Sequence, residues 1–216
     1  MTEATKGLRS RQKEMRHRQI LDASARLFAE KGFEATTIDE IAAMSLTSVP
    51  TVYKYFAAKN DILFALFEAE ERSVEPLVRK MLKSLPPDPV DALVKIEMLV
   101  LCDGFDRTKK RVWREISAAG VRADGIQRTH FVSLQKLQME WLENAFEVMK
   151  AKGTVKADLD CGRAARMIYG VARNNFLIFV VNDEMSEGEL EQELRADFEI
   201  ATKGFLPLLL AQEHST

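Results

Sequence analysis

The chain has 216 residues, 46% of them hydrophobic, which is enough for the core of one large domain or of a small domain joined to a larger one. Its formal net charge is -2, but residues 1–60 carry ten Lys and Arg against seven Asp and Glu, and the remaining residues carry twenty-one against twenty-six. The two cysteines, Cys102 and Cys161, have no CxxC spacing, which argues against a disulfide framework or a cysteine zinc site and favours a reduced, cytoplasmic protein.

Nothing in the sequence predicts export or a membrane span. The basic N-terminus lacks the apolar segment of a signal peptide. The longest fully apolar run, Phe176 to Val181, is far shorter than the roughly 20 residues that cross a bilayer. We therefore expect a soluble protein with no membrane partner.

Apolar residues recur at helical spacing along almost the whole chain, and no convincing alternation of apolar and polar residues marks a strand. The pattern predicts an all-α fold of about nine helices. The first helix is expected from roughly Lys13 to Lys31, and Gly32 followed by Phe33 is typical of a left-handed helix cap with an apolar contact.

The N-terminal residues are strongly basic. Residues 1–18 contain six basic side chains against two acidic ones, and the basic residues are Lys6, Arg9, Arg11, Lys13, Arg16 and Arg18. Such an excess favours contact with an anionic polymer, and we take Arg11 and Arg16 as candidate contacts. The alternative is a solvated, frayed tail.

Two short helices are expected next. Thr37 and Glu40 have the spacing of a capping box, which begins a second helix. Ser48, with Pro50 in the following turn, marks the start of a third. That helix places Val49, Val52 and Phe56 on one face, so Pro50, Thr51, Lys54 and Tyr55 must point elsewhere.

The exposed face of the third helix suits the major groove of DNA. Pro50 and the Thr51 methyl group match thymine methyl groups, while Tyr53, Lys54, Tyr55 and the Thr51 hydroxyl match phosphates or base edges. Lys59 lies at the start of the next helix, where a phosphate would be held by the ammonium and by free backbone N–H groups, and Thr37 has a similar position. For Lys59 the alternative is an exposed lysine balanced by Asp61.

These residues resemble the N-terminal DNA-binding domain of the TetR family of bacterial transcriptional repressors. The resemblance covers Ile20 to Leu63, and its landmarks are Ile20, Leu21, Ala23, Leu27, Phe28, Gly32, Phe33, Thr36, Thr37, Ile41, Ala42, Tyr53, Phe56 and Lys59. It implies that the third helix is the recognition helix of a helix-turn-helix. It implies base-proximal roles for Val49, Pro50, Thr51 and Tyr55, and phosphate roles for Thr37, Ser48, Tyr53 and Lys59.

One position departs from the family. Leu46 stands where these proteins usually have a glycine in a left-handed turn. Either Leu46 accepts a positive φ at a cost of roughly 1 to 2 kcal/mol, or the turn rearranges so that its side chain fills a core site. We expect the rearrangement, with a tilted recognition helix.

The rest of the chain shows no family motif. Helices are expected near residues 59–83, 90–103, 107–119, 125–151, 158–182 and 187–211. Arg173, Asn174 and Asn175 lie together in a very apolar helix and need partners, which a polar helix face, a dimer contact or a ligand would supply. Phe105, Trp113, Trp141 and Tyr169 are candidate lining residues of an apolar ligand pocket, together with Arg173 and Asn174; core packing is the alternative.

The sequence therefore predicts a DNA-binding and helix-turn-helix domain over residues 1–58 and a ligand-binding and dimerisation domain over residues 59–216. A single helix-turn-helix reads few base pairs, so we expect a homodimer on a palindromic operator in double-stranded DNA. The resemblance implies pairing through the last two helices, and a repressor released from DNA by a small-molecule effector that the sequence does not name.

Other classes of function are disfavoured. The sequence has no phosphate-binding loop, nucleophile elbow, zinc-protease motif or dinucleotide fingerprint, and His17, His130 and His214 lack metal-ligand spacing. Carboxylate pairs such as Glu70 and Glu71 are expected to be solvated helix ends. We therefore predict no catalysis, cofactor or metal. A helical adaptor that uses the same exposed face for a protein partner remains the alternative.

Overall fold

The computed structural model describes the backbone of residues 3–102 and 107–204, and the side chains of residues 11–101 and 110–202. Within these ranges the chain forms nine α-helices and a final π-helical turn, without strands, which confirms the all-α prediction. The helices are α1 (Glu3–Lys31), α2 (Ile38–Met44), α3 (Val49–Tyr55), α4 (Lys59–Leu82), α5 (Pro89–Cys102), α6 (Arg107–Arg122), α7 (Gly125–Ala151), α8 (Cys161–Val181) and α9 (Glu187–Glu199), and the turn η1 is Ile200–Gly204.

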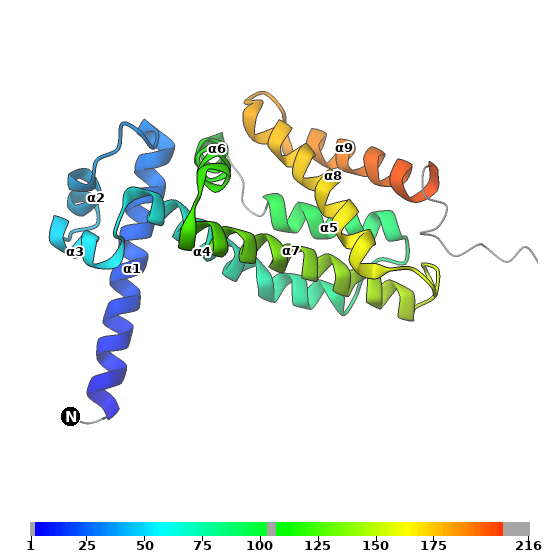
Figure 1. The fold of residues 1–216 in the computed structure, drawn as a ribbon, viewed down its shortest axis with the longest axis horizontal. Coiled ribbons are helices and arrows are strands. Elements are labelled where there is room, and N and C mark those ends of the chain that lie inside the picture. Colours follow the sequence, from blue (N-terminus) through cyan, green and yellow to red (C-terminus); the bar gives the residue numbers. More distant parts are fainter. Residues whose placement is uncertain (1–2, 103–106, 205–216) are drawn as a thin grey trace, which may run out of the picture. The chain divides into compact units, whose positions relative to one another are not determined.

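The described residues divide into two compact units (Figure 1). The first unit contains residues 3–69 and 107–128, and the second contains residues 70–102 and 129–204. Both α4 and α7 contribute residues to each unit. The predicted functional boundary after residue 58 stays a prediction, because compactness alone does not test it.

The first helix is longer than the sequence analysis expected. α1 is helical from Glu3, whereas apolar spacing predicted a start near Lys13. At its other end Gly32 has φ +90°, and its N–H donates to the Phe28 carbonyl over 3.0 Å. The Phe28 and Phe33 rings then pack edge to face, with centroids 5.1 Å apart. The predicted left-handed cap with its apolar contact is confirmed.

The first unit packs α2 and α6 against α1, and α3 against α2 (Figure 1). Its buried apolar side chains include Ile20, Leu27, Phe28, Phe33, Ile41, Val52, Phe56, Ile62 and Phe67. Arg111 of α6 donates from its guanidinium to the carbonyls of Glu30 and Lys31, both over 3.2 Å, at the end of α1. These carbonyls lack partners within the helix, so Arg111 caps α1 from outside.

The second unit is held by α9, which packs against both α5 and α8 (Figure 1). Leu190, Leu194 and Phe198 of α9 are fully buried. Two polar contacts join the same helices: the Arg195 guanidinium lies 2.6 Å from the Asp91 carboxylate, and the Asn175 amide donates to Asp197 over 2.7 Å.

The helix bounds follow the sequence prediction closely in this unit. The last predicted helix, 187–211, is observed as α9 and η1, and its apolar positions Phe205, Leu206 and Leu209 lie outside the described residues. In the part of the chain that the structure describes, no helix has the length and apolar character needed to cross a membrane.

Candidate nucleic-acid interface and interior polar cluster

The third helix is short because residues at both ends stop it. Ser48 is its N-cap with extended backbone, Pro50 lies in the first turn, and Phe56 ends it with an extended conformation. Val52 and Phe56 are buried, so α3 is anchored by this apolar edge. The helix therefore offers its other residues to a partner.

The exposed face of α3 holds the side chains that the sequence predicted. Pro50, Tyr53 and Lys54 are exposed, while Thr51 and Tyr55 are half-buried. The Ser48 and Thr51 hydroxyls are 2.8 Å apart and share a hydrogen bond. This face combines an apolar ring, aromatic hydroxyls and one cation, which matches the mixture of methyl groups, base edges and phosphates in a major groove.

The turn between α2 and α3 corrects the expectation for Leu46. Leu46 has φ +53° and is 87% exposed, so it takes the left-handed conformation and fills no core site. Ser45, next to it, is buried, and its hydroxyl donates to the Ile41 carbonyl over 2.7 Å. The predicted rearrangement is wrong because the backbone keeps the turn and leaves the leucine side chain in solvent.

Lys59 occupies a position that the sequence did not anticipate. Its ammonium donates to the carbonyls of Phe33 (2.6 Å), Thr36 (3.0 Å) and Glu34 (3.3 Å), and it lies 4.4 Å from the centre of the Phe33 ring. These contacts fasten the start of α4 to the connection between α1 and α2. A phosphate contact from this ammonium would require at least one of these carbonyls to lose its donor.

Thr37 and Glu40 form the predicted capping box at the start of α2. The Glu40 N–H donates to the Thr37 hydroxyl over 3.2 Å, and the Thr37 N–H donates to the Glu40 carboxylate over 3.0 Å. A hydrogen bond from Lys31, then one from the Thr37 backbone, lower the pKa of Glu40. The Thr37 hydroxyl still has a proton to donate, and Arg11 and Arg16 are exposed on α1.

The predicted pocket residues are divided between the two units. Trp113 belongs to the first unit and packs edge to face on Phe67, with centroids 5.3 Å apart. Trp141 belongs to the second unit, where it packs with Val74 and Val78. Asn174 is exposed, and Phe105 lies outside the described residues.

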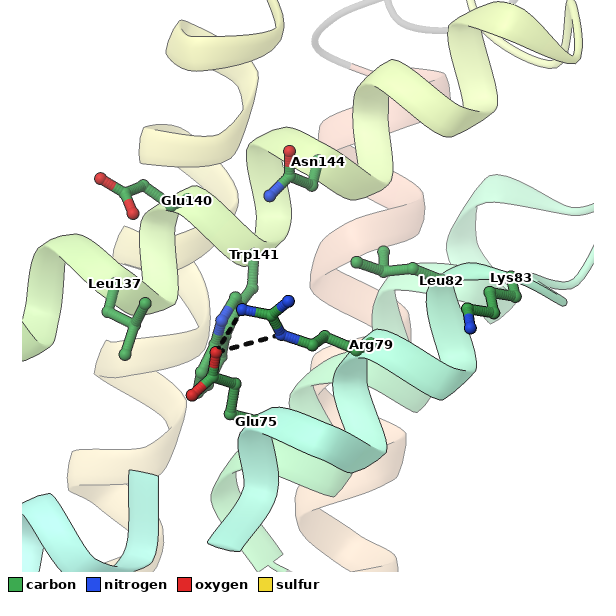
Figure 2. Close-up of a pocket in the computed structure, with 8 residues that line it drawn as sticks. All are labelled: Glu75, Arg79, Leu82, Lys83, Leu137, Glu140, Trp141 and Asn144. Atoms are coloured by element: carbon green, nitrogen blue, oxygen red, sulfur yellow. Dashed lines mark hydrogen bonds and ion pairs between the residues drawn. The ribbon is translucent and has the colours of Figure 1, made fainter. Parts of the chain in front are cut away.

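Trp141 also borders a groove of about 470 Å³ between α4 and α7 (Figure 2). At its edge the Arg79 guanidinium lies 2.6 Å from the carboxylate of Glu75, which is one turn earlier on the same helix. Both side chains are in contact with solvent, and ion pairs in this setting contribute little to stability. The groove is an open surface feature with mixed polar and apolar lining, and it lacks the enclosed character of a small-molecule pocket.

A different set of residues, missed by the sequence analysis, forms a polar group inside the second unit. We call it the interior polar cluster, and its members are Glu71 of α4, Glu97 of α5, Gln138 of α7, and Tyr169 and Arg173 of α8. Both carboxyl side chains are only 4% exposed. The prediction that Glu71 is a solvated helix end is wrong, because it lies in the middle of α4.

Hydrogen bonding in the interior polar cluster is incomplete. The Gln138 amide donates to Glu71 Oε1 over 2.6 Å. Among the described residues, Glu71 Oε2, which is shielded from solvent, has no hydrogen-bond partner. Buried polar atoms are normally paired, so this oxygen calls for an explanation.

The electrostatics of the cluster follow from its burial. Desolvation raises the pKa of Glu97 to about 8, and the charge of Glu71 adds to the rise. Desolvation also raises the pKa of Glu71 to about 7, against the Gln138 hydrogen bond and the nearby charge of Arg173. Burial lowers the pKa of Arg173, which the charges of Tyr169 and Glu71 partly offset. Burial therefore disfavours the charged form of both carboxyl groups and of the guanidinium.

The sequence did contain a signal for these carboxyl groups. Glu97 follows Val90 and Leu93 at seven and four residues and precedes Leu101 by four, so it occupies an apolar helix face. Glu71 precedes Val74 and Val78 by three and seven residues in the same way. A carboxyl group on the buried stripe of a helix is a better indicator of an interior site than an aromatic residue at helical spacing.

The first unit contains a helix-turn-helix formed by α2 and α3, and α3 exposes Pro50, Tyr53 and Lys54. Residues 20–66 match the family model described as bacterial regulatory proteins, tetR family. The matched residues therefore carry the helix-turn-helix domain of this family, and the curated proteins that the chain resembles are transcriptional regulators, not enzymes.

Similar proteins extend beyond the N-terminal domain. The fatty acid metabolism regulator protein of Bacillus subtilis (strain 168) is 25% identical over 175 residues, which cover 81% of this chain and 88% of that protein. The crystal structure of FadR from Bacillus subtilis in complex with stearoyl-CoA has a TM-score of 0.66 at 23% identity, covering 87% of this chain and 98% of that one.

A second solved structure is similar to the same extent. FadR of Thermus thermophilus, a TetR-family transcriptional repressor in complex with lauroyl-CoA, has a TM-score of 0.66 at 20% identity, covering 88% of this chain and 95% of that one. At these identities the two structures establish a shared fold.

Proposed function

We propose that this regulator is a repressor that binds a palindromic operator as a homodimer and leaves it when a small-molecule effector binds the second unit. The observation that carries the proposal is the exposed α3 face, which is fixed by buried Val52 and Phe56 and presents Pro50, Tyr53 and Lys54. A rigid two-turn helix with this surface suits the major groove.

The proposed DNA contacts fall into two groups. Base-proximal residues are Val49, Pro50, Thr51 and Tyr55, and residues that reach phosphates or base edges are Thr37, Ser48, Tyr53, Lys54, Lys59, Arg11 and Arg16. For Lys59 the backbone N–H groups at the start of α4 are the better phosphate donors, because its ammonium is engaged with three carbonyls.

Dimerisation is proposed through the last two helices. α8 exposes three apolar side chains close to its end, Leu177, Ile178 and Val181, and Ile200 of η1 is also exposed. We expect an Ile178→Asp variant to sediment as a monomer and to lose operator binding, whereas Val132→Asp, at an exposed position of α7, stays dimeric. A monomeric wild-type protein would contradict this part of the proposal.

The effector is proposed to act from the second unit, where buried Glu71 Oε2 has no hydrogen-bond partner among the described residues. Binding there would favour a dimer geometry in which the two recognition helices no longer match half-sites about 34 to 36 Å apart. The stearoyl-CoA and lauroyl-CoA complexes of the similar structures make an acyl-CoA one effector to test.

The test is selection of bound duplexes from a random DNA pool by the purified protein. We expect a palindrome whose enrichment weakens or changes in Tyr55→Ala but persists in Tyr169→Phe, a control outside the first unit. Binding should also weaken steeply with salt, because phosphate contacts release counterions. A folded dimer that enriches no sequence at low salt would contradict the proposal and favour the adaptor alternative.

A further inference from the structure

The interior polar cluster has an unbalanced set of charges. Glu71, Glu97 and Arg173 come from three different helices and face the same interior region, where the charges of Glu71 and Arg173 affect each other and the charge of Glu71 affects Glu97. Among the described residues, Arg173 is the one cation whose charge acts on either carboxyl group, and it acts on Glu71. When both carboxyl groups are ionised, it compensates only one of them. A buried charge without a counter-charge is strongly unfavourable.

The missing partner must donate hydrogen bonds. Glu71 Oε2 is a buried acceptor without a donor, although Oε1 of the same carboxyl group is satisfied by Gln138. An ammonium group supplies up to three donors and one positive charge, which matches both deficits.

Other ligand chemistries match less well. A carboxylate or phosphate would be repelled by two carboxyl groups and would bring no donor to Glu71 Oε2. An acyl chain would leave both carboxyl groups without a partner in an apolar interior. The adjoining turns of the same helices are apolar. Val74 follows Glu71 by three residues on α4, and Trp141 follows Gln138 by three on α7. Val74, Val78 and Trp141 pack together.

We propose that the interior polar cluster binds the positively charged nitrogen of an amphipathic amine, with Glu71 and Glu97 as its carboxylate partners and an apolar body directed to the side of Val74 and Trp141. This inference rests on the proposed function, because it names the chemical class of the effector that the second unit accepts.

The titration of the cluster gives the proposal a specific signature. An ammonium group binds to ionised carboxylates, so a carboxyl group that is protonated must lose its proton first. Glu97 keeps its proton up to about pH 8, beside Glu71, Tyr169 and Arg173. Affinity for an amine should therefore rise with pH below about 8, by up to about tenfold per pH unit.

The experiment is calorimetric titration of the purified full-length protein, without DNA, with four probes: hexylammonium, 1-hexanol, hexanoate and lauroyl-CoA. An alkylammonium keeps its charge below pH 9, because its pKa is near the value of about 10.4 for lysine. We expect hexylammonium to bind at least about tenfold more tightly than 1-hexanol at pH 7. Hexanoate should not bind.

Three variants locate the site. Glu71→Gln and Glu97→Gln should each weaken hexylammonium binding by about tenfold or more and flatten its pH dependence. Glu75→Gln, one turn along α4 in the open groove, is the control and should bind like the wild type. If a buried variant fails to fold, the pH series on the wild type still decides the question.

Three outcomes would overturn the proposal: hexanoate or lauroyl-CoA binding while hexylammonium does not, hexylammonium affinity that is independent of pH, or no probe binding to the folded protein. The proposed function is tested separately by operator selection, which uses no ligand. A protein that selects an operator but ignores hexylammonium would therefore refute the amine proposal and leave the DNA-binding proposal intact.

Discussion

The two compact units differ in how completely their polar side chains are paired with hydrogen-bond and charge partners. In the first unit, Lys59 donates to three backbone carbonyls, Arg111 caps the end of α1, and Thr37 and Glu40 complete a capping box. In the second unit, two carboxyl groups are buried near the Arg173 guanidinium, and shielded Glu71 Oε2 lacks a hydrogen-bond partner among the described residues.

The difference matches two kinds of recognition. A surface that binds a polymer along its outside gains from a rigid, internally satisfied scaffold, because its contacts must keep fixed spacing. An interior that accepts a small molecule must keep some groups unmatched until the ligand arrives, at a cost in stability. Removing a buried carboxyl group from the second unit should therefore stabilise the protein, whereas removing a hydrogen-bonding side chain from the first unit should destabilise it.

The largest expected effect is in the second unit, at Glu97. The folded chain holds the Glu97 proton up to about pH 8, whereas the unfolded chain releases it near the ordinary pKa of 4.5. Between these values the folded chain binds more protons, so the free energy of unfolding falls as pH rises and levels off above about 8. Glu97→Gln should remove this pH-dependent loss. Above about pH 8 its free energy of unfolding should exceed that of the wild type by at most about 5 kcal/mol.

The measurement is thermal unfolding of the wild type and Glu97→Gln from pH 5 to pH 9. Part of the slope should remain in the variant, because the pKa of Glu71 is raised in the same direction, to about 7. Parallel curves for the two proteins would mean that Glu97 is ionised in the folded chain, and would remove the contrast between the units.

The next effect is in the first unit, at Lys59. Lys59→Met leaves the carbonyls of Phe33 and Thr36 without their charged donor and should cost about 2 to 3 kcal/mol. Lys54→Met, on the exposed face of α3, is the control and should change stability by less than about 0.5 kcal/mol. Equal stability of the two variants would show that Lys59 is not a structural fastener.

Fluorescence during urea unfolding can show which of the two units the Lys59→Met substitution destabilises. The chain has two tryptophans, Trp113 in the first unit and Trp141 in the second. In a Trp141→Phe background, Trp113 alone reports on the first unit from its contact with Phe67.

A smaller loss is expected at Gly32. An alanine there would take φ +90°, and its methyl group would lie 2.7 Å from the Arg111 guanidinium, so Gly32→Ala should cost about 2 kcal/mol in urea unfolding. Gly153→Ala is the matched control, since Gly153 also has a positive φ but open space around it. If both variants lose the same amount, the Arg111 cap contributes nothing to the difference.

The smallest expected effect is a stabilisation in the first unit, at Leu46. Leu46 has a positive φ and an exposed side chain, so Leu46→Gly relieves the strain and loses little burial. The greater freedom of glycine in the unfolded chain offsets part of the gain, and we expect about 0.5 to 1 kcal/mol of stabilisation. Leu46→Val should destabilise, because a β-branched residue tolerates this conformation poorly. Thermal unfolding of both variants checks the order, and a destabilised Leu46→Gly would contradict it.

The sequence predicted most helix bounds because apolar periodicity and glycine or proline stops coincide. The bounds of α4 and α7 and the cap at Gly32 are examples. The start of α1 was missed because residues 3–12 carry little apolar periodicity. Most residues of this segment, such as Glu3, Ala4, Lys6, Leu8 and Arg9, are good helix formers, and intrinsic propensity without an apolar stripe leaves no periodic signal.

Two further errors have a common physical origin. Leu46 was expected in the core and Glu71 in solvent, because hydrophobic side chains are usually inside and charged ones outside. At Leu46 the geometry of the turn decides the outcome, and at Glu71 the position on the apolar stripe of α4 decides it. Backbone geometry and helix face are therefore stronger evidence than residue type at both positions.

The most direct test is the affinity of the selected operator for the protein, measured with and without hexylammonium, in the wild type and in Glu97→Gln. We predict that hexylammonium weakens operator binding roughly 5- to 150-fold in the wild type, the usual range of coupling between sites, and changes it little in the variant. Unchanged operator affinity at hexylammonium concentrations that saturate the wild type would contradict it.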